Sequence, residues 1–210
     1  MARYAITDIH GCSATFASLL RRIDLQKDDE LYLLGDYIDR GPDSAGVLKQ
    51  VWKLEAEGYN VLCLRGNHEQ MLQEALTRGS TPWDYRPEKE MEARILQWIN
   101  DLPYYHETPG YLLVHAGLDF RRADPLSDTE AMMWIRNWEP DLDLAWLDDR
   151  IVVYGHTPRM VDQVAEEVLY ARERQRVCLD SGCAMSGPGH GHLSALNLDT
   201  LEGYYEKRAD

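Results

Sequence analysis

The apolar positions of the chain form two alternating patterns, short continuous runs and runs at helical spacing. Continuous runs typical of buried strands occupy residues 4–7, 31–34, 61–64, 111–114, 151–154, 176–179, 193–198 and 203–206. Helical spacing is found between them, over residues 13–23, 47–54, 71–76, 88–100 and 129–138. Strand and helix alternate as far as about residue 115, and strand-rich sequence follows. This order predicts an α/β fold in which helices cover mixed sheets.

Three segments between these elements follow neither pattern, and we expect loops there. Residues 80–87 contain two prolines, and residues 139–147 are acidic and irregular. Residues 166–176 alternate in charge and are expected to turn in solvent. In the first of these loops, Trp83 and Tyr85 can either form a flap on the substrate side of a site or cover the neighbouring helix.

The length and charge narrow the classes of function. The 210 residues are enough for a sizeable core, and we expect a single domain over residues 1–210. Lys and Arg number 22 and Asp and Glu number 36, which gives a formal charge of −14. Because nucleic acids and anionic membranes are bound mainly through Lys and Arg, this balance argues against long nucleic acid and membranes as partners. No apolar run approaches the roughly 18 residues of a membrane span, no signal peptide is recognised, and the four cysteines are scattered, so a cytoplasmic location is expected.

Six polar residues follow the ends of five predicted strands. They are Asp8, His10, Asp36, Asn67, His115 and His156. Taken singly, an Asp or Asn after a strand is usually a turn former, and a lone His is usually a hydrogen-bonded core or surface group. In α/β sheets, however, ligands bind outside the carboxyl ends of the strands. Polar residues at five strand ends therefore favour one shared site.

The chemistry of this set indicates metal ions. Two aspartates, three imidazoles and one amide oxygen are too many ligands for one small cation, and they suit two divalent ions that share a carboxylate. Nitrogen and oxygen ligands without thiolate favour manganese, iron or zinc over calcium. Two such ions about 3.5–4 Å apart clamp a phosphoryl group and lower the pKa of water. Water would then be the nucleophile.

The same residues belong to five motifs that occur in a fixed order. The motifs are DIHG at 8–11, GDYIDRG at 35–41, RGNHE at 65–69, HAG at 115–117 and GH at 155–156. Together they resemble the phosphoprotein phosphatase family of calcineurin-like metallophosphoesterases, and the size is similar to its compact bacterial and phage members. The resemblance runs from about residue 3 to residues 180–183. It implies a four-layer αββα sandwich of mixed sheets flanked by helices, with a dimetal site at the carboxyl ends of the strands.

The resemblance also implies a role for each site residue. One metal ion would be bound by Asp8, His10 and Asp36. The other would be bound by Asp36, Asn67, His115 and His156, with Asp36 bridging the two. His68 would be the general acid, oriented by Asp39, and phosphate oxygens would be bound by Arg40, Arg136 and, as a weaker third, Arg65. Two divalent ions are implied, with Mn²⁺ as the first choice and Fe or Zn as alternatives.

The sequence departs from the family pattern at two positions. Thr7 precedes Asp8 where the family usually has glycine, and metal binding is expected to survive this change. Ala116 follows His115 where eukaryotic protein phosphatases have glycine. That alanine is familiar in bacterial members and in symmetrical diadenosine tetraphosphate hydrolases. The substrate is therefore the property that the resemblance leaves most open.

Three functions are compatible with this sequence. The leading hypothesis is a dimetal phosphomonoesterase acting on phosphoserine or phosphothreonine, with a phosphorylated peptide, a protein or a small phosphate ester as substrate. The alternative is a symmetrical dinucleoside polyphosphate hydrolase or phosphodiesterase that uses the same site. A non-catalytic scaffold is disfavoured because all six ligand positions and the His68/Asp39 pair are present. The oligomeric state is open, and residues 187–192, with His190 and His192, are more consistent with a flexible loop than with extra ligands.

Overall fold

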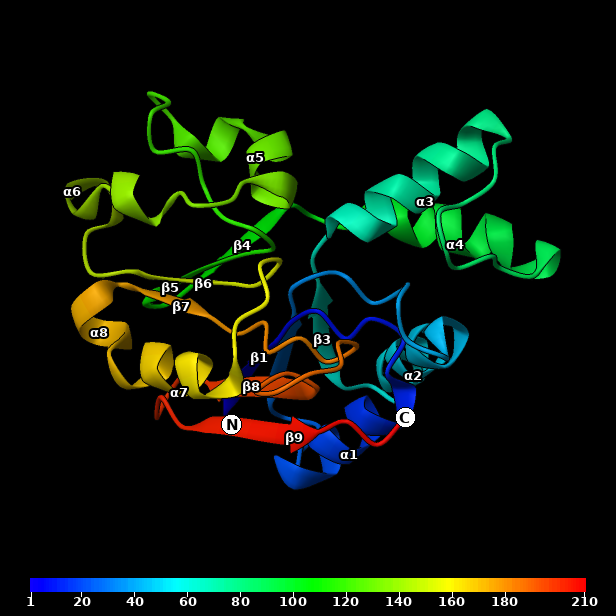
Figure 1. The fold of residues 1–210 in the computed structure, drawn as a ribbon, viewed down its shortest axis with the longest axis horizontal. Coiled ribbons are helices and arrows are strands. Elements are labelled where there is room, and N and C mark those ends of the chain that lie inside the picture. The colour runs from blue at the N-terminus through cyan, green and yellow to red at the C-terminus, as the bar shows by residue number, and fades with distance from the viewer.

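Two β-sheets lie face to face at the centre of the molecule (Figure 1). The computed structural model describes residues 1–210. The first sheet has the order β3-β2-β1-β8-β9. Its strands are β1 (Arg3–Ile6), β2 (Glu30–Leu33), β3 (Asn60–Cys63), β8 (His192–Asn197) and β9 (Gly203–Lys207). The first three pair in parallel and the last two are antiparallel. The carboxyl ends of β1, β2 and β3 therefore share one edge.

The second sheet has the order β4-β5-β6-β7. Its strands are β4 (Tyr105–Thr108), β5 (Tyr111–Val114), β6 (Ile151–Tyr154) and β7 (Arg176–Cys178). β5, β6 and β7 are parallel, while β4 pairs with β5 as an antiparallel hairpin. The carboxyl ends of the three parallel strands again lie together.

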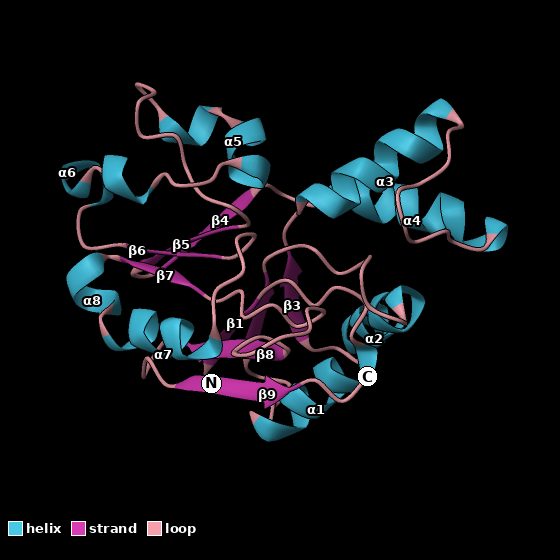
Figure 2. Ribbon diagram, in the orientation of Figure 1, coloured by secondary structure: helices cyan, strands magenta, loops and turns pink.

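Helices cover the outer face of each sheet (Figure 2). On the side of the first sheet lie α1 (Ser13–Arg22) and α2 (Ser44–Ala56), and α3 (Asn67–Arg78) and α4 (Lys89–Asp101) lie side by side beyond its edge (Figure 1). The second half of the chain contributes α5 (Thr129–Trp134), α6 (Leu144–Leu147), α7 (Val161–Leu169), α8 (Ala171–Arg174) and the 3₁₀ turns η1 (Pro125–Ser127) and η2 (Glu139–Asp141). None of these helices is long and apolar enough to span a membrane.

The layers follow from the alternation of side chains along each strand. Ala5 and Leu113 belong to a buried cluster between the two sheets. Their neighbours Tyr4 and Leu112 point the opposite way, into the two clusters that pack beneath the outer helices. The α/β fold with two mixed sheets flanked by helices, which the sequence predicts, is confirmed.

The structure corrects the predicted elements in several places. Residues 139–147, expected to be a loop, contain the 3₁₀ turn η2 and the helix α6. β4 was not predicted, because an edge strand that is half exposed carries no continuous apolar run. The helix predicted over 129–138 ends at Trp134, because the chain turns at Asn137, with φ +55°, to bury Trp138.

The charged run over residues 166–176 is not a solvent turn, and that prediction is wrong. It contains the end of α7 and all of α8. Glu167 is only 4% exposed, and its carboxylate lies 2.8 Å from Nη1 of Arg176 and 3.5 Å from Nη1 of Arg159. A buried carboxylate requires such partners, and charge alternation along the sequence does not reveal them.

Candidate dimetal site

The loops after five strands bring the predicted ligands to one place. Asp8 and His10 follow β1, Asp36 follows β2, His115 follows β5 and His156 follows β6. A sixth, Asn67, begins α3 after β3, with His68 beside it. All seven side chains belong to residues that are at most 5% exposed. Their common position is that expected for the carboxyl edge of parallel strands.

The backbone that carries these side chains is strained. Positive φ angles occur at Asp8 (52°), His10 (47°), Asp36 (55°), Asp39 (70°) and His156 (69°). This region is costly for residues other than glycine, and such residues cluster at functional sites. Hydrogen bonds between the loops hold the conformation: His10 donates its N–H to the Asp36 carbonyl at 2.9 Å, and Asp8 donates to Gly35 at 3.2 Å.

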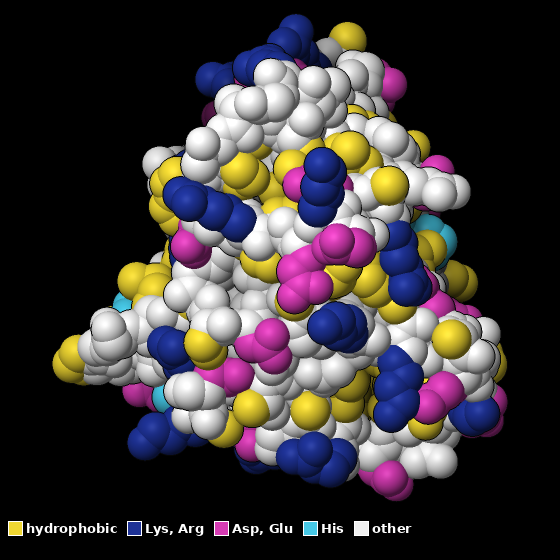
Figure 3. Space-filling model, turned by 90° about the vertical axis from the view of Figure 1, so that its right-hand side faces the viewer, with side chains coloured by type: hydrophobic (Ala, Val, Ile, Leu, Met, Phe, Trp, Pro, Cys, Tyr) yellow, Lys and Arg dark blue, Asp and Glu magenta, His cyan; other side chains and the backbone are white.

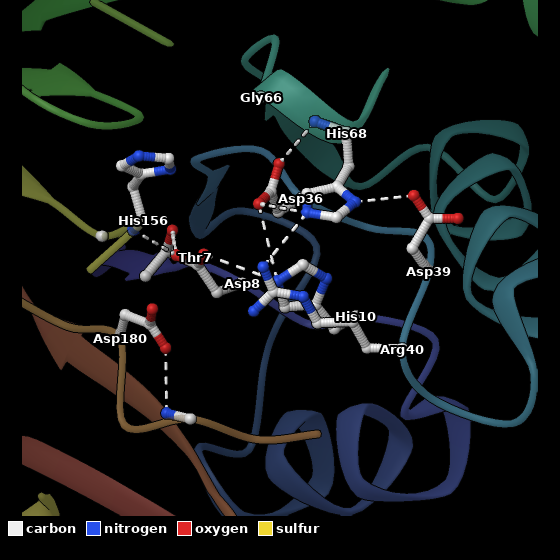
Figure 4. A network of polar contacts seen from close by, with 12 residues as sticks. Thr7, Asp8, His10, Asp36, Asp39, Arg40, Gly66, His68, His156 and Asp180 are labelled. Atoms are coloured by element: carbon white, nitrogen blue, oxygen red, sulfur yellow. Dashed lines mark hydrogen bonds and ion pairs between the residues drawn. The ribbon is translucent and has the colours of Figure 1, made fainter. Parts of the chain in front are cut away.

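The Asp36 carboxylate lies at the centre of the cluster (Figure 4). Its Oδ2 is 3.5 Å from Nε2 of His10, and its Oδ1 is 3.5 Å from Nε2 of His115. Asp8 lies on the His10 side, with its Oδ1 3.9 Å from Nε2 of His10. One carboxylate between two imidazole groups has the arrangement of a bridging ligand.

The remaining ligands gather on the other side of Asp36. The amide oxygen of Asn67 lies 3.0 Å from Nε2 of His115 and 2.9 Å from Nδ1 of His156. Possible ligand atoms of Asp36, His115 and His156 all lie within 4.8 Å of one another. A second group within the same limit consists of His10, Asp36 and His68. The two groups share Asp36, as expected from the sequence, but the group on the His10 side contains His68 and not Asp8.

Hydrogen bonds to the backbone fix which nitrogen faces the cluster. His10 donates from Nδ1 to the carbonyl of Ile38, and His115 donates from Nδ1 to the carbonyl of Leu34, both at 2.9 Å. A carbonyl oxygen only accepts, so Nδ1 carries the hydrogen in each ring. Nε2 then presents a lone pair to the cluster, as in most metal-binding histidines.

The electrostatics keep these ligands in the protonation state that metals require. Burial lowers the pKa of His10, and burial together with the neighbouring His115 lowers the pKa of His156 to about 3. Burial alone would raise the pKa of Asp36, but His115, His68 and His10 hold it well below its usual range. Neutral imidazoles and an ionised carboxylate are the ligand forms that bind cations.

Two unpartnered atoms test whether the residues fit metal ions. Oδ1 of Asp8 and Nε2 of His156 are buried and have no hydrogen-bond partner. Buried polar atoms are normally paired, so each unpaired one requires an explanation. Both are electron-pair donors in the cluster, and a cation would satisfy them. The donor set of carboxylate, imidazole and amide therefore fits two divalent ions.

His68 differs from the other histidines of the site. Its Nδ1 lies 2.6 Å from Oδ2 of Asp39. Burial alone would lower the pKa of His68, but the hydrogen bond to Asp39 and the charge of Asp36 raise it. An imidazole with a raised pKa, held by a carboxylate, can keep a proton at Nε2 and donate it.

The structure brings two of the three predicted phosphate-binding arginines near the cluster. Nη2 of Arg40 lies 3.3 Å from Nε2 of His68. Arg136 is exposed, its Nη1 is 3.5 Å from the hydroxyl of Thr157, and its charge contributes to the lowered pKa of His156.

Arg65 is not brought into the cluster. Its guanidinium is buried on the side of α4, donates to the carbonyl of Ile99 at 2.5 Å and lies over the ring of Tyr104. A guanidinium held there has no access to a substrate at the metal ligands, so its predicted phosphate contact is not supported by this arrangement.

Two buried carboxylates of the site were not singled out from the sequence. Glu69 accepts hydrogen bonds from the backbone N–H groups of Asp36, Tyr37 and Gly66 at 2.9–3.1 Å, and burial together with Asp36 raises its pKa to about 7. Asp180 follows β7, and burial together with Asp8 raises its pKa (Figure 4). Both had a usable signal: Glu69 is the last residue of RGNHE, and Asp180 follows a sixth apolar run.

The loop over residues 80–87 lies against the His68/Asp39 pair. The carboxylate of Asp84 accepts a hydrogen bond from the backbone N–H of Arg40 at 2.6 Å. The backbone N–H of Tyr85 donates to Oδ1 of Asp39 at 2.7 Å. Trp83 faces the site, with its ring 5.3 Å from that of His68, while the Tyr85 side chain packs on the core. Of the two alternatives for this loop, Trp83 therefore takes the position of a flap at the site, and Tyr85 takes the position of a covering residue.

His190 and His192 do not join the cluster. His192 begins β8, and its Nδ1 lies 3.1 Å from the carbonyl of His190. Neither belongs to the groups of possible metal ligands.

Comparison with known proteins agrees with this geometry. The sequence profile of the family described as calcineurin-like phosphoesterase matches residues 1–180. A protein named symmetrical bis(5′-nucleosyl)-tetraphosphatase from Nitrosococcus oceani is 32% identical over 173 residues, which are 71% of this chain and 60% of that protein. One of the same name from Nitrosomonas europaea is 37% identical over 125 residues, 56% of this chain and 45% of that protein. The matched region spans about half the length of these curated relatives.

Solved structures show the same fold. A crystal structure provisionally assigned to a diadenosine tetraphosphatase has a TM-score of 0.70 and 21% identity, and covers 100% of this chain and 95% of its own. A serine/threonine protein phosphatase from Saccharomyces cerevisiae has a TM-score of 0.70 and 15% identity, and covers 100% of this chain and 81% of its own. At these identities the likeness concerns the fold alone.

Proposed function

The chain belongs to the calcineurin-like phosphoesterase family, and from this premise we propose that it is a dimetal-dependent hydrolase of dinucleoside tetraphosphates, cleaving them symmetrically. The observation that carries the proposal of phosphate hydrolysis is the convergence of two overlapping ligand groups on Asp36, beside the His68/Asp39 pair. The substrate class is supported by the names of the curated relatives. These names favour the alternative substrate over the phosphoserine or phosphothreonine preferred from the sequence.

Divalent ions bound by this cluster would supply Lewis acidity at the phosphoryl oxygens and lower the pKa of water. Arg40 and Arg136 would bind phosphate oxygens and offset the charge that gathers on the transferring group. Arginine suits this task because its planar guanidinium meets two oxygens at once. We propose Mn²⁺ as the ion, because a site without thiolate ligands suits it.

His68 would complete the reaction by proton transfer. As the water oxygen bonds to phosphorus, the bond from phosphorus to the bridging oxygen breaks, and Nε2 of His68 donates its proton to the departing oxygen. Asp39 holds the ring through Nδ1, 2.6 Å away, and so aims Nε2 at the leaving group. For diadenosine tetraphosphate, one water consumed gives two molecules of adenosine diphosphate.

A substrate panel tests the proposal. Diadenosine tetraphosphate, a phosphoserine peptide and a bis-aryl phosphodiester are compared at equal Mn²⁺ concentration by kcat/KM, with the products identified by chromatography. We expect a preference of about tenfold or more for the dinucleotide, with adenosine diphosphate as the single nucleotide product. A preference for the phosphopeptide, or asymmetric products, would contradict it. Less than one equivalent of bound transition metal, without activation by added Mn²⁺, would instead favour a non-catalytic scaffold.

A further inference from the structure

Two exposed tryptophans flank the cluster. Trp83 is 64% exposed and Trp134 is 41% exposed, and no other tryptophan is among the large exposed hydrophobic residues. The Trp83 ring lies 5.3 Å from that of His68, and the Trp134 ring lies 6.4 Å from that of His156. In Figure 4, His68 and His156 lie on either side of Asp36. The two tryptophans therefore lie on opposite sides of Asp36, one beside His68 and the other beside His156.

Trp83 is held in place by the two residues that follow it. Asp84, the next residue, accepts from the backbone of Arg40, and Tyr85 donates its backbone N–H to Asp39. The loop is thus tied to the residues that would orient the general acid and bind phosphate. Because His68 would protonate the departing oxygen, the free face of Trp83 lies on the leaving-group side.

Trp134 is also held in a fixed position, on the His156 side of the cluster. It is the last residue of α5, which is fixed to the His115 loop by a hydrogen bond of 2.7 Å from the N–H of Ala116 to the carbonyl of Met132. It lines a surface hollow of about 320 Å³ together with Arg121 and Arg122, which are paired with Asp119 and Asp128, and with Glu130. Arg136, the proposed phosphate ligand, follows two residues later.

Acidic side chains are not concentrated on the side of the molecule where α3 and α4 lie. On the face shown in Figure 3, acidic and basic side chains are interspersed, so no continuous acidic surface is seen there despite the net charge of −14. Aromatic rings stack on nucleobases of any sequence, because every base has a π-face.

We propose that Trp83 and Trp134 stack the two bases of a dinucleoside tetraphosphate, Trp83 the base of the departing nucleoside diphosphate and Trp134 that of the other half. This inference rests on the proposed function. It gives symmetrical cleavage a structural reason: a base held on each side of the metal ligands places the bridge between the two central phosphates at the cluster.

The test distinguishes binding of the bases from binding of the phosphates. Trp83→Ala, Trp134→Ala and the corresponding Phe variants are compared with wild type in KM and kcat for diadenosine tetraphosphate, and in inhibition constants for adenosine diphosphate and for pyrophosphate, which lacks a base. Tyr170→Ala is the matched control, because Tyr170 is 39% exposed but lies on the Arg174 guanidinium, outside the ligand groups.

Each Ala variant is expected to raise KM for the dinucleotide about tenfold or more, the effect of losing one stacked base, with kcat changed far less. Inhibition by pyrophosphate should stay within about twofold, and the Phe variants should recover most of the affinity. Unchanged KM values in both Ala variants, or equal weakening of pyrophosphate, would overturn the stacking sites while leaving the proposed function intact. Wild-type protein that cleaves the phosphopeptide but not the dinucleotide would overturn both.

Discussion

At the scale of single residues, the site shows how one residue type acquires different chemistry from its surroundings. The imidazole rings of His10 and His156 are buried and donate no hydrogen bond to a carboxylate, and their pKa values fall. His68 is also buried, but its Nδ1 donates to Asp39 and its pKa rises. Environments that push pKa values apart assign the roles. By this criterion, the first two suit metal binding and the third suits proton donation.

The role proposed for His68 predicts a dependence on the leaving group. His68→Asn should lower kcat by about 100-fold or more for phenyl phosphate, whose departing phenolate has a pKa of about 10 and requires a proton. The loss should be much smaller for diadenosine tetraphosphate, since a departing phosphate group has a pKa of about 6. Steady-state kinetics and metal content by mass spectrometry check this. Equal losses on both substrates would argue for a binding role instead.

The close packing around Gly155 predicts that a side chain at this position disturbs metal binding. A Cβ at this position would lie 2.0 Å from Oδ2 of Asp8 and 2.4 Å from the hydroxyl of Thr7. Gly155→Ala should therefore displace the Asp8 carboxylate and lower metal content and activity together. Gly58→Ala is the control for backbone strain alone: a Cβ there meets nothing within 4 Å, but φ is +82°, so this variant should lose some stability and keep its metal content. Full metal loading of the Gly155 variant would show that Asp8 is dispensable.

At the scale of elements, the molecule depends on buried charges that tie helices to strands. α7 packs on β7 through Glu167, whose two carboxylate oxygens both lie 2.8 Å from Nη1 of Arg176. Near the site, Glu69 of α3 similarly accepts from the backbone of Asp36 and Tyr37 after β2. Glu167 thus holds α7 against the beginning of β7, and Glu69 holds α3 against the chain that follows the end of β2.

Glu167→Gln tests the first of these ties. Removing the charge leaves Arg176 and Arg159 partly buried with one partner fewer, and the free energy of unfolding should fall by about 2–3 kcal/mol. Glu166→Gln is the matched control: Glu166 pairs with Arg174 while 55% exposed, and its loss should cost less than about 1 kcal/mol. Urea titrations of both variants make the comparison. Equal stabilities would mean that the buried pair contributes no more than the exposed one.

At the scale of the whole molecule, stability should depend on acid-labile contacts between distant segments. Glu139 of η2 accepts from the hydroxyl of Tyr154 in β6 at 2.9 Å and lies 2.5 Å from Nη2 of Arg159. Burial alone would raise the pKa of Glu139, but these contacts and its own backbone hydrogen bond lower it. A lowered pKa stabilises the folded state above the unfolded pKa of about 4.3, and this is lost as pH falls through the folded value.

Glu139→Gln should therefore reduce the free energy of unfolding by about 1–2 kcal/mol at pH 7. The difference from wild type should shrink below about pH 4 and disappear once the wild-type carboxyl group is protonated as well. Denaturant titrations across this pH range measure both. A difference that is constant with pH would show that the charge of Glu139 is not the cause.

The sequence by itself determined the fold class and the set of candidate ligand residues that the structure brings together at Asp36. Both depend on order along the chain: apolar runs define strands, and residues just after parallel strands must share an edge. For this reason Asp8, Asn67 and His156 could be predicted to lie together although they are far apart in sequence.

Only the tertiary structure decided where long or ambiguous side chains point. Arg65 turns to Ile99 rather than to phosphate, Glu167 is buried rather than solvated, and Trp83 faces His68 while Tyr85 faces the core. The partner of each is distant in sequence or on another element, and a flexible side chain selects it by local packing and charge. Strand order fixes where a backbone arrives, whereas the neighbours that meet there fix what its side chains do.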